Sequence, residues 1–373
     1  STEEYMKRIC VYGCSETFGG TERYLMTMYQ AIDRTKIQFD FLFPHDIGDI
    51  SYRNQIEALG GKIYCEYYKY SEKKDADFIS PEKLISKHPE WDGVYVNWQS
   101  VDTAYRLIIA AKKMKLQYRV IHAHNSDYNR PFGLKDKIYE RFFYLSKDKY
   151  VTDYLACSEQ AGKWLFKMEK ENFTVIPNAV PFEKFAFSKE KRDAVRMKYQ
   201  ISDQEIVLGF CGRLVAQKNP EYLLHIFEDV HKKEPRTKLL MVGDGVMRKE
   251  IENQIRALHL QKSVIMTGAV SNVENYMQAM DCFLVPSRFE GFGIVLLEAQ
   301  AAGLPCFASK NIVPEETNLT GNVCFIKLED GAEKWANVIL SKPMNRYDGM
   351  DELLNSDYTV DKAAKKLMNI FDC

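Results

Sequence analysis

The 373-residue sequence lacks several features that mark common protein classes. Its nine cysteines lie singly along the chain, with Cys10 and Cys14 as the closest pair, so they indicate neither a disulfide framework nor a zinc site. The formal charge is only -1, which argues against nucleic acid as a partner of the whole protein. No apolar run approaches the roughly 18 residues of a membrane span, and residues 1–7 lack the apolar core of a signal peptide. We therefore expect a cytoplasmic protein that does not cross a membrane.

The length and the alternation of segments predict two α/β domains. A chain of this length exceeds one typical core, and apolar strand-like runs alternate with helical ones, which predicts parallel sheets with helices on both faces. We predict a Rossmann-like domain over residues 1–178, a second over residues 179–355, and a C-terminal helix in residues 356–373 that packs back on the first. Strands are predicted at residues 7–13, 37–43, 62–66, 93–97, 119–124, 153–158, 173–177, 206–211, 238–242, 264–267, 281–285, 305–308 and 323–326.

Residues 286–299 follow a buried apolar run and lead into a helix. The glycines on either side of Phe292 permit close approach of the backbone to a ligand. Free amides of the first helical turn form an anion site, and Glu290 and Glu298 place a carboxylate on each side. Because amides hold phosphate and carboxylates accept hydrogen bonds from paired hydroxyls, the stretch suits a phosphorylated sugar. The alternative is an ordinary strand-to-helix turn with two solvated glutamates.

Other chemically distinctive residues also fall at predicted strand ends. Residues 13–20 form a glycine loop before a helix, a second candidate phosphate cradle, although its spacing is not the dinucleotide fingerprint. Arg213 and Lys218 share one loop before a helix, where a guanidinium fork and an ammonium could bind a diphosphate; a solvated basic loop is the alternative. His122 and His124 end a strand, where open α/β sheets bind ligands. Two histidines that merely cap the strand would give the same pattern.

These motifs together carry a family resemblance. They are Gly19-Gly20-Thr21-Glu22-Arg23, His122-Ala123-His124-Asn125, Gly212-Arg213-Leu214 with Lys218-Asn219-Pro220, Val242-Gly243-Asp244-Gly245, and Glu290-x7-Glu298. The set resembles the retaining GT-B glycosyltransferases of family 4, above all the bacterial exopolysaccharide and capsule enzymes. The resemblance covers nearly the whole chain, and its most specific part is the E-x7-E element with an upstream Arg and Lys. It implies two Rossmann-like, doubly wound domains that face each other across a cleft.

The resemblance also implies roles for individual residues. Arg213 and Lys218 would neutralise the donor diphosphate, and Glu298 would accept the ribose hydroxyls. Glu290, with the amides of Phe292 and Gly293, would hold hydroxyls of the donor sugar. His124 corresponds to the family's active-site histidine, with His122 as the second choice. The implied catalytic set is His124, Glu290, Arg213 and Lys218, and further donor contacts are implied for Gly19, Gly20, Val270, Ile294 and Val295.

Family members need no divalent cation, so the resemblance implies neither a metal nor a cofactor. Asp75-Ala76-Asp77 matches the metal-binding D-x-D of the other large glycosyltransferase architecture. We interpret it as a chance match, because no strand leads into it and lysines surround it.

The implied reaction is transfer of a hexose or N-acetylhexosamine from a nucleotide sugar, most simply a UDP-sugar, with retention of configuration. No carboxylate is an obvious nucleophile, so we favour attack on the same face, in which the leaving phosphate helps to deprotonate the acceptor. Two alternatives remain open. One is a nucleotide-sugar epimerase on the same fold, and the other is a non-catalytic nucleotide-sugar-binding subunit.

Residues 103–149 bear on the acceptor, because they hold eleven Lys or Arg against four Asp or Glu, with aromatic residues between them. Such a face could rest on anionic lipid at the inner side of the plasma membrane and meet a saccharide linked to polyprenyl diphosphate. Two ordinary helices that cover the sheet, with their lysines in water, are the alternative.

Overall fold

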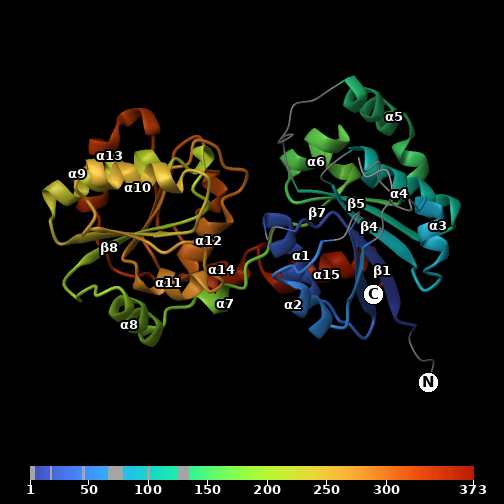
Figure 1. The fold of residues 1–373 in the computed structure, drawn as a ribbon, viewed down its shortest axis with the longest axis horizontal. Coiled ribbons are helices and arrows are strands. Elements are labelled where there is room, and N and C mark those ends of the chain that lie inside the picture. The colour runs from blue at the N-terminus through green and yellow to red at the C-terminus, as the bar shows by residue number, and fades with distance from the viewer. Residues whose placement is uncertain (1–4, 17–18, 44–46, 66–78, 99–100, 125–133) are drawn as a thin grey trace. The chain divides into compact units, whose positions relative to one another are not determined.

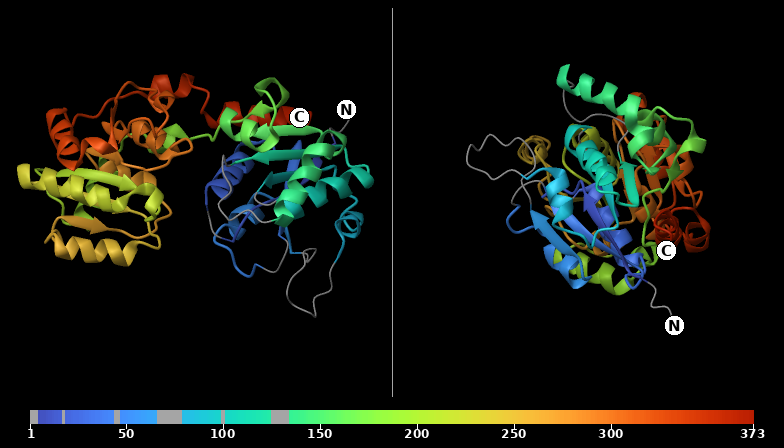
Figure 2. Two further views of the ribbon diagram at one scale, coloured as in Figure 1. Left: turned by 90° about the horizontal axis from the view of Figure 1, so that it is seen from above. Right: turned by 90° about the vertical axis from the view of Figure 1, so that its right-hand side faces the viewer.

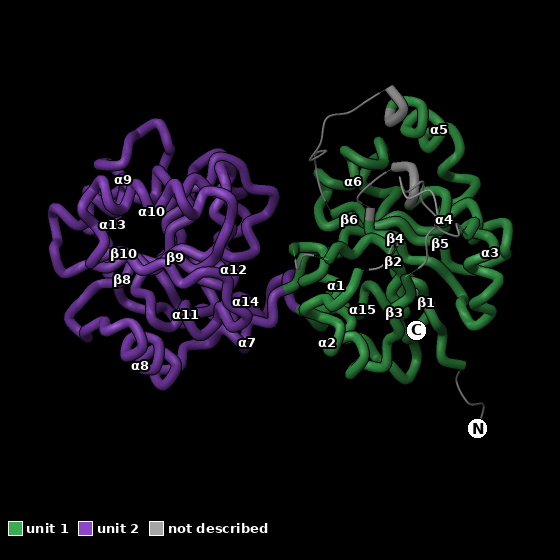
Figure 3. Tube along the Cα trace, in the orientation of Figure 1, with its two compact units in different colours: residues 1–179, 360–373 green, residues 180–359 purple. Residues whose placement is uncertain are grey.

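The computed structural model describes residues 5–16, 19–43, 47–65, 79–98, 101–124 and 134–373. The chain divides into two compact units, residues 1–179 with 360–373 (unit 1) and residues 180–359 (unit 2), as Figure 3 shows. The sequence placed these divisions after residues 178 and 355. Each unit has its own parallel sheet and hydrophobic core, so the predicted pair of Rossmann-like α/β domains is confirmed.

In the described residues, unit 1 forms a seven-stranded parallel sheet. Alternate residues of a strand face opposite sides, so Ile9 and Val11 join one core cluster and Cys10 the other. The strand order is β3 (Lys62–Cys65), β2 (Ile37–Phe43), β1 (Lys7–Tyr12), β4 (Gly93–Trp98), β5 (Tyr118–Ala123), β6 (Asp153–Ala156) and β7 (Thr174–Val175).

Helices cover both faces of this sheet (Figures 1 and 2). One face carries α1 (Gly20–Ala31), α2 (Arg53–Ala58) and α15 (Val360–Ile370). The other carries α3 (Pro81–Ser86), α4 (Val101–Lys113), α5 (Leu134–Tyr150) and α6 (Glu159–Phe166), which is followed by the 3-10 turn η1 (Lys170–Asn172).

Helix α15 comes from the end of the chain but belongs to unit 1. Its buried residues Ala363 and Leu367 pack in the same core as α1. Lys7 Nζ of β1 donates a hydrogen bond to the carbonyl oxygen of Phe371 at 2.6 Å. The C-terminal helix thus returns to the N-terminal unit.

Unit 2, over its described residues, forms a six-stranded parallel sheet. The strand order is β10 (Val264–Met266), β9 (Thr237–Val242), β8 (Ile206–Cys211), β11 (Cys282–Val285), β12 (Cys306–Ser309) and β13 (Val323–Ile326). The helices are α7 (Phe182–Phe185), α8 (Lys189–Lys198), α9 (Pro220–Lys233), α10 (Arg248–Ala257), α11 (Val273–Ala279), α12 (Ile294–Ala301), α13 (Ala332–Ser341) and α14 (Met350–Asn355), and the 3-10 turns are η2 (Ala216–Lys218), η3 (Glu315–Thr317) and η4 (Leu328–Asp330).

A partly buried ion cluster lies at the start of β11, which begins one residue later than predicted. Arg192 and Arg196 of α8 each lie 2.7 Å from a carboxylate oxygen of Asp281. The same carboxylate accepts a hydrogen bond from the amide of Val207 at 2.8 Å. Asp281 therefore anchors a helix to the sheet, and the strand itself starts at Cys282.

Both sheets contain a topological switch point. In unit 1 the chain runs outward from β1 to β2 and β3 and then returns to β4 on the other side of β1, and unit 2 does the same with β8, β9, β10 and β11. At such a point the loops after the two central strands diverge, and α/β proteins bind ligands between them. The loops after β8 and β11 are therefore the expected ligand site of unit 2.

Candidate active site

Two loops at the switch point of unit 2 are tied together. We call residues 212–219 the β8 loop and residues 286–293 the β11 loop. The Arg288 amide donates to the carbonyl oxygen of Gln217 at 2.8 Å. Asn219, in the left-handed conformation at φ 57°, donates from Nδ2 to the first carbonyl oxygen of the β11 loop at 3.1 Å. The two loops therefore hold each other in place.

An ion pair between Lys218 and Glu290 joins the same two loops. Lys218 Nζ lies 2.6 Å from Glu290 Oε2, and the two side chains are only 17% and 8% exposed. The Ser287 hydroxyl donates to the same carboxylate oxygen at 3.2 Å. Because an isolated buried charge is costly, each partner makes burial of the other tolerable. The sequence predicted the two residues separately, as a phosphate ligand and a sugar ligand, and their direct contact was not anticipated.

Arg213 supplies an exposed cation in the β8 loop. Its guanidinium makes no hydrogen bond or ion pair with the residues that the structure describes. Its backbone surroundings are fixed, because the Leu214 amide donates to the Asp244 carbonyl oxygen at 2.9 Å. Gly243, at φ 133°, passes so close that a Cβ there would lie 2.0 Å from the carbonyl oxygen of Gly212. A fixed backbone with an unengaged guanidinium suits a diphosphate.

Helix α12 begins directly after the β11 loop. Gly293 precedes it in the left-handed conformation at φ 75°, which glycine adopts without the strain that a Cβ adds. The amides of Ile294 and Val295 occupy the first turn, where the helix offers no acceptor, so together with the helix dipole they favour an anion. Glu298 lies one turn further along and is 4% exposed.

Two further predicted donor residues are half-buried in unit 2. The Phe292 ring packs on Tyr358, with 4.8 Å between ring centroids. Val270 follows β10, whose end is tied to β9 because the Gly243 amide donates to the Gly268 carbonyl oxygen at 2.9 Å. Val270 thus lies at the carboxyl end of the sheet, like the β8 and β11 loops.

In unit 1, Glu22 organises the predicted glycine loop. Gly19 is the N-cap residue of α1, and its amide donates to Glu22 Oε2 at 2.9 Å. The amide of Ser15 donates to Oε1 of the same carboxylate at 2.6 Å. Glu22 thus engages the Gly19 amide, and the space beside Gly20 is open, since a Cβ there would meet nothing within 4 Å.

His122 and His124 lie at the end of β5, against α1. Their rings stack with 4.1 Å between centroids, and Tyr24 of α1 lies 5.0 Å from each. His122 is fully buried and its Nδ1 is 2.6 Å from the Tyr95 hydroxyl. His124 is half-buried and its Nε2 is 2.6 Å from Asn97 Oδ1. Burial lowers the pKa of His122 far below its ordinary value and that of His124 to about 3, so both are neutral at pH 7.

Comparison with known proteins identifies the family. Residues 191–342 match the family described as glycosyl transferases group 1. A protein named as the glycosyltransferase EpsF of Bacillus subtilis (strain 168) is 29% identical over 326 residues, which cover 86% of this chain and 84% of EpsF. The crystal structure of Anabaena HepE in complex with UDP and glucose superposes with a TM-score of 0.73 at 18% identity, over 99% of this chain and 100% of HepE. Residues 191–342 thus match the group 1 glycosyl transferases, and the whole chain has the GT-B fold.

A third relative matches a smaller part of this glycosyltransferase. It is the UDP-Gal:alpha-D-GlcNAc-diphosphoundecaprenol alpha-1,3-galactosyltransferase of Escherichia coli, which is 33% identical over 159 residues. The match covers 42% of this chain and 39% of the galactosyltransferase.

The predicted site residues of the glycosyltransferase form two groups, one in each unit. Unit 2 brings together the β8 loop, the β11 loop and the start of α12. Unit 1 holds Gly19, Gly20 and His124 at the carboxyl ends of its own strands. That both groups act on one substrate stays a prediction. Asn125 and Asp75-Ala76-Asp77 lie outside the described residues.

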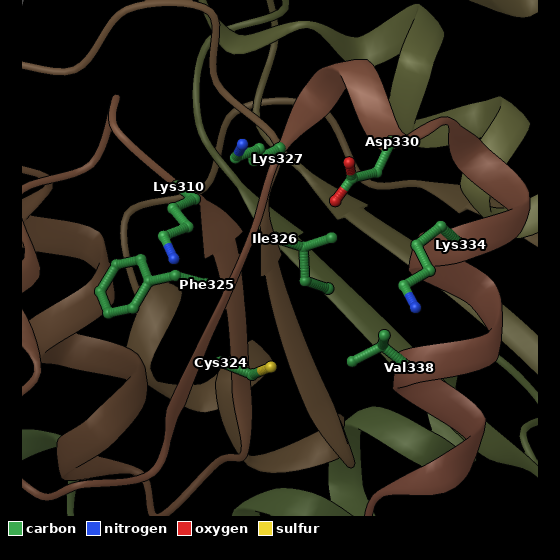
Figure 4. A pocket seen from close by; sticks show the side chains of 8 residues that line it. All are labelled: Lys310, Cys324, Phe325, Ile326, Lys327, Asp330, Lys334 and Val338. Atoms are coloured by element: carbon green, nitrogen blue, oxygen red, sulfur yellow. The ribbon is translucent and has the colours of Figure 1, made fainter.

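A surface pocket of about 280 Å³ lies elsewhere in unit 2 of the glycosyltransferase (Figure 4). None of the predicted site residues lines it, because it is formed by Lys310, Cys324, Phe325, Ile326, Lys327, Asp330, Lys334 and Val338.

Among the described residues, no three His, Cys, Asp or Glu side chains are grouped to hold a metal ion. Over the same residues, no helix combines the length and apolar character needed to cross a membrane.

Sequence reasoning missed the contacts of three residues that position this site. Asn97 contacts His124, Ser287 contacts Glu290, and Asn219 joins the two loops of unit 2. Each is a short polar residue near the end of a strand or the start of a helix. That position was the available signal, since such side chains commonly bond to nearby backbone and side-chain groups.

Proposed function

We propose that this glycosyltransferase transfers a hexose or N-acetylhexosamine from a UDP-sugar to a saccharide or a polyprenyl-diphosphate-linked saccharide, in the synthesis of a surface polysaccharide. Transfer retains the anomeric configuration and needs no metal ion. One observation carries the proposal: the Lys218–Glu290 pair joins the loop that carries exposed Arg213 to the loop that leads into α12.

The chemistry of the reaction explains why these groups are needed. Breaking the bond between sugar and diphosphate builds negative charge on the leaving group and positive charge on the sugar ring. Arg213, Lys218 and the first-turn amides of α12 stabilise the leaving diphosphate, and groups fixed before the reaction lower its barrier most. Glu290 accepts sugar hydroxyls with the lone pairs that Lys218 and Ser287 leave free, and Glu298 accepts the ribose hydroxyls.

The relatives support the choice of donor and acceptor. HepE binds UDP and glucose. The name of the Escherichia coli galactosyltransferase gives UDP-Gal as the donor and a saccharide on diphosphoundecaprenol as the acceptor. A UDP-sugar donor and a lipid-linked saccharide acceptor are therefore the combination to test first.

A thermal-shift panel of UDP-, GDP- and ADP-sugars tests the donor. A ligand that binds only the folded protein raises its melting temperature by mass action, so we expect UDP-sugars alone to raise it. Stabilisation by GDP- or ADP-sugars, with none by UDP-sugars, would refute the base assignment.

Release of free UDP, measured with and without acceptor, tests the reaction class. A transferase releases UDP in proportion to the acceptor consumed. An epimerase interconverts UDP-sugars without net UDP release, and a non-catalytic subunit binds UDP but turns over no donor.

Two further measurements test the stereochemistry and the role of metal. NMR of the new glycosidic bond should show the anomer of the donor, and an inverted product would contradict retention. Turnover should persist in a metal chelator, because Arg213 and Lys218 supply the charge that a divalent cation supplies elsewhere.

Helix α5 offers the surface through which the protein would meet a membrane-bound acceptor. The apolar side chains of Ile138, Phe142 and Leu145 are 63%, 48% and 77% exposed, at helical spacing along one face. Lys137 and Arg141 are exposed beside them. Apolar groups flanked by cations match the interface of an anionic bilayer. By contrast, Tyr105, Tyr118 and Phe143, also within residues 103–149, are buried.

Co-sedimentation with vesicles of phosphatidylglycerol and phosphatidylcholine tests this surface. Reversing two cations, as in Lys137→Glu/Arg141→Glu, should weaken binding by roughly 30-fold, since each cation near an anionic surface contributes about 1 kcal/mol. The matched control is Lys112→Glu/Lys115→Glu, two exposed lysines in the last turn of α4 and just after it. A wild-type protein that never co-sediments, or a control that fails equally, would exclude α5 as the contact.

A further inference from the structure

Asn97, which no sequence motif marks, lies in a polar network inside unit 1. It stands opposite His122 in the register of β4 and β5, and it is fully buried. Because alternate residues share a face, Tyr95, His122 and His124 line the same side of the sheet as Asn97. Tyr24 of α1 covers this side, with ring contacts to His122 and His124 and its hydroxyl 3.3 Å from that of Tyr95.

The contacts of Asn97 determine which nitrogen of His124 carries the proton. Asn97 Nδ2 faces the carbonyl oxygen of Tyr12 at 3.4 Å, and a carbonyl only accepts hydrogen bonds. That orientation turns Oδ1 toward His124, 2.6 Å from Nε2. Since Oδ1 also only accepts, Nε2 must donate. The neutral ring then carries its lone pair on Nδ1.

The surroundings of His124 keep this state. Its ring is packed between His122, at 4.1 Å, and Tyr24, at 5.0 Å, which restricts its rotation. Burial keeps the ring neutral at pH 7, as its lowered pKa shows. His124 is half-buried whereas His122 is fully buried, so His124 is the member of the pair that a substrate can reach.

We propose that Asn97 is a positioning residue for the transfer reaction: it holds His124 as the Nε2–H tautomer, so that Nδ1 accepts a hydrogen bond from a sugar hydroxyl. This inference rests on the proposed function and adds the tautomer and the residue that fixes it. A cationic His124, or one protonated on Nδ1, could only donate from that position and would leave the hydroxyl proton without an acceptor.

Nitrogen-15 NMR of the wild-type protein tests the tautomer without any change at Asn97. The protein has seven histidines, and comparison with His124→Gln assigns the ring of interest. We expect His124 to be protonated on Nε2 alone between about pH 5 and pH 8. Protonation on Nδ1, or a mixture of both forms, would overturn the proposal.

Kinetics of Asn97→Leu test the consequence for transfer. Leucine has a similar size and no acceptor, so we expect kcat/KM to fall about 100-fold through misplacement of His124, while the affinity for UDP changes less than about twofold. Asn97→Asp restores an acceptor oxygen, but its negative charge raises the pKa of His124. At about pH 8 His124 is neutral again, so this variant should recover part of the lost kcat/KM. Tyr118→Phe, which removes a hydroxyl bonded to Asp372 at the other end of β5, serves as the control, with turnover within about threefold of wild type.

The outcomes separate the inference from the function on which it rests. Wild-type turnover in Asn97→Leu would overturn the role of Asn97 while leaving the transferase intact. If Asn97→Leu does not fold, the tautomer of His124 in the wild type and the kinetics of Asn97→Asp still test the role of Asn97. A wild-type protein that neither binds UDP nor consumes a UDP-sugar would contradict the proposed function itself.

Discussion

Replacing Lys218 by methionine removes the charge but keeps the length of the side chain. At 2.6 Å and an effective dielectric constant of about 20, the attraction between Lys218 and Glu290 is about 6 kcal/mol before desolvation, which offsets much of it. The variant leaves Glu290, whose side chain is 8% exposed, with Ser287 as its remaining side-chain partner among the described residues. We therefore expect unit 2 to lose about 2–3 kcal/mol of stability.

A double-mutant cycle isolates the pair. Lys218→Met/Glu290→Gln removes both charges, so it should lose less stability than the two single variants added together, with a coupling of about 1–3 kcal/mol. Urea denaturation of the four proteins measures this coupling. The control is Lys232→Met, which removes an exposed surface partner of Glu228 and should change stability by less than about 0.5 kcal/mol.

The same variant tests the catalytic role of Lys218. Loss of one preorganised charge at the leaving group costs about 3–4 kcal/mol, so kcat for UDP release should fall by about 100- to 1,000-fold while the protein stays folded. Glu290→Gln should also lose transfer, because it weakens the grip on the sugar hydroxyls. Turnover within about threefold of wild type in either variant, or additive stabilities in the cycle, would refute this account of the site.

Three other changes probe the framework. Gly243→Ala should cost at least about 2 kcal/mol and weaken UDP binding, because its Cβ would collide with the Gly212 carbonyl oxygen; unchanged melting and affinity would contradict this. Because burial lowers the pKa values of His122 and His124, the free energy of unfolding is highest above about pH 6.5 and decreases as the pH falls. His124→Gln should reduce this decrease by about 2 kcal/mol between about pH 6.5 and pH 5, as measured by urea titration at each pH. Leu367→Ala should destabilise unit 1 by about 3 kcal/mol in the same assay without changing UDP affinity, because α15 packs with α1.

The parts of the fold that could be predicted are those with a strong apolar pattern. The strands at residues 206–211 and 323–326 have the predicted bounds, because continuous apolar runs between polar ends specify buried parallel strands. Helix α8 gave no such signal, since it is mostly charged and is held by ion pairs to Asp281. Helix α5 runs to Tyr150, beyond its apolar pattern, and tertiary contacts such as Tyr105 with Ser146 hold its last turns.

In the candidate site, the positions of residues could be predicted but their contacts could not. Glycines, charges and strand ends indicated where Arg213, Glu290 and Glu298 lie, since the loops that carry them follow strand ends that topology brings together. Pairwise contacts were not predictable, because they depend on side-chain directions across elements far apart in sequence. Lys218 and Glu290 are 72 positions apart, and Asn97 and His124 are 27 apart.

Calorimetric titration of UDP into the wild-type protein and Arg213→Met tests the central claim most directly. The account predicts one UDP per chain, and a loss of about 10- to 100-fold in affinity in the variant, because the guanidinium contributes charge-assisted hydrogen bonds to the diphosphate. Arg236→Met, which removes an exposed arginine paired with Glu234, should bind like wild type. Equal affinity in wild type and Arg213→Met, or no binding by the wild type, would contradict the assignment of the unit 2 loops as the donor site.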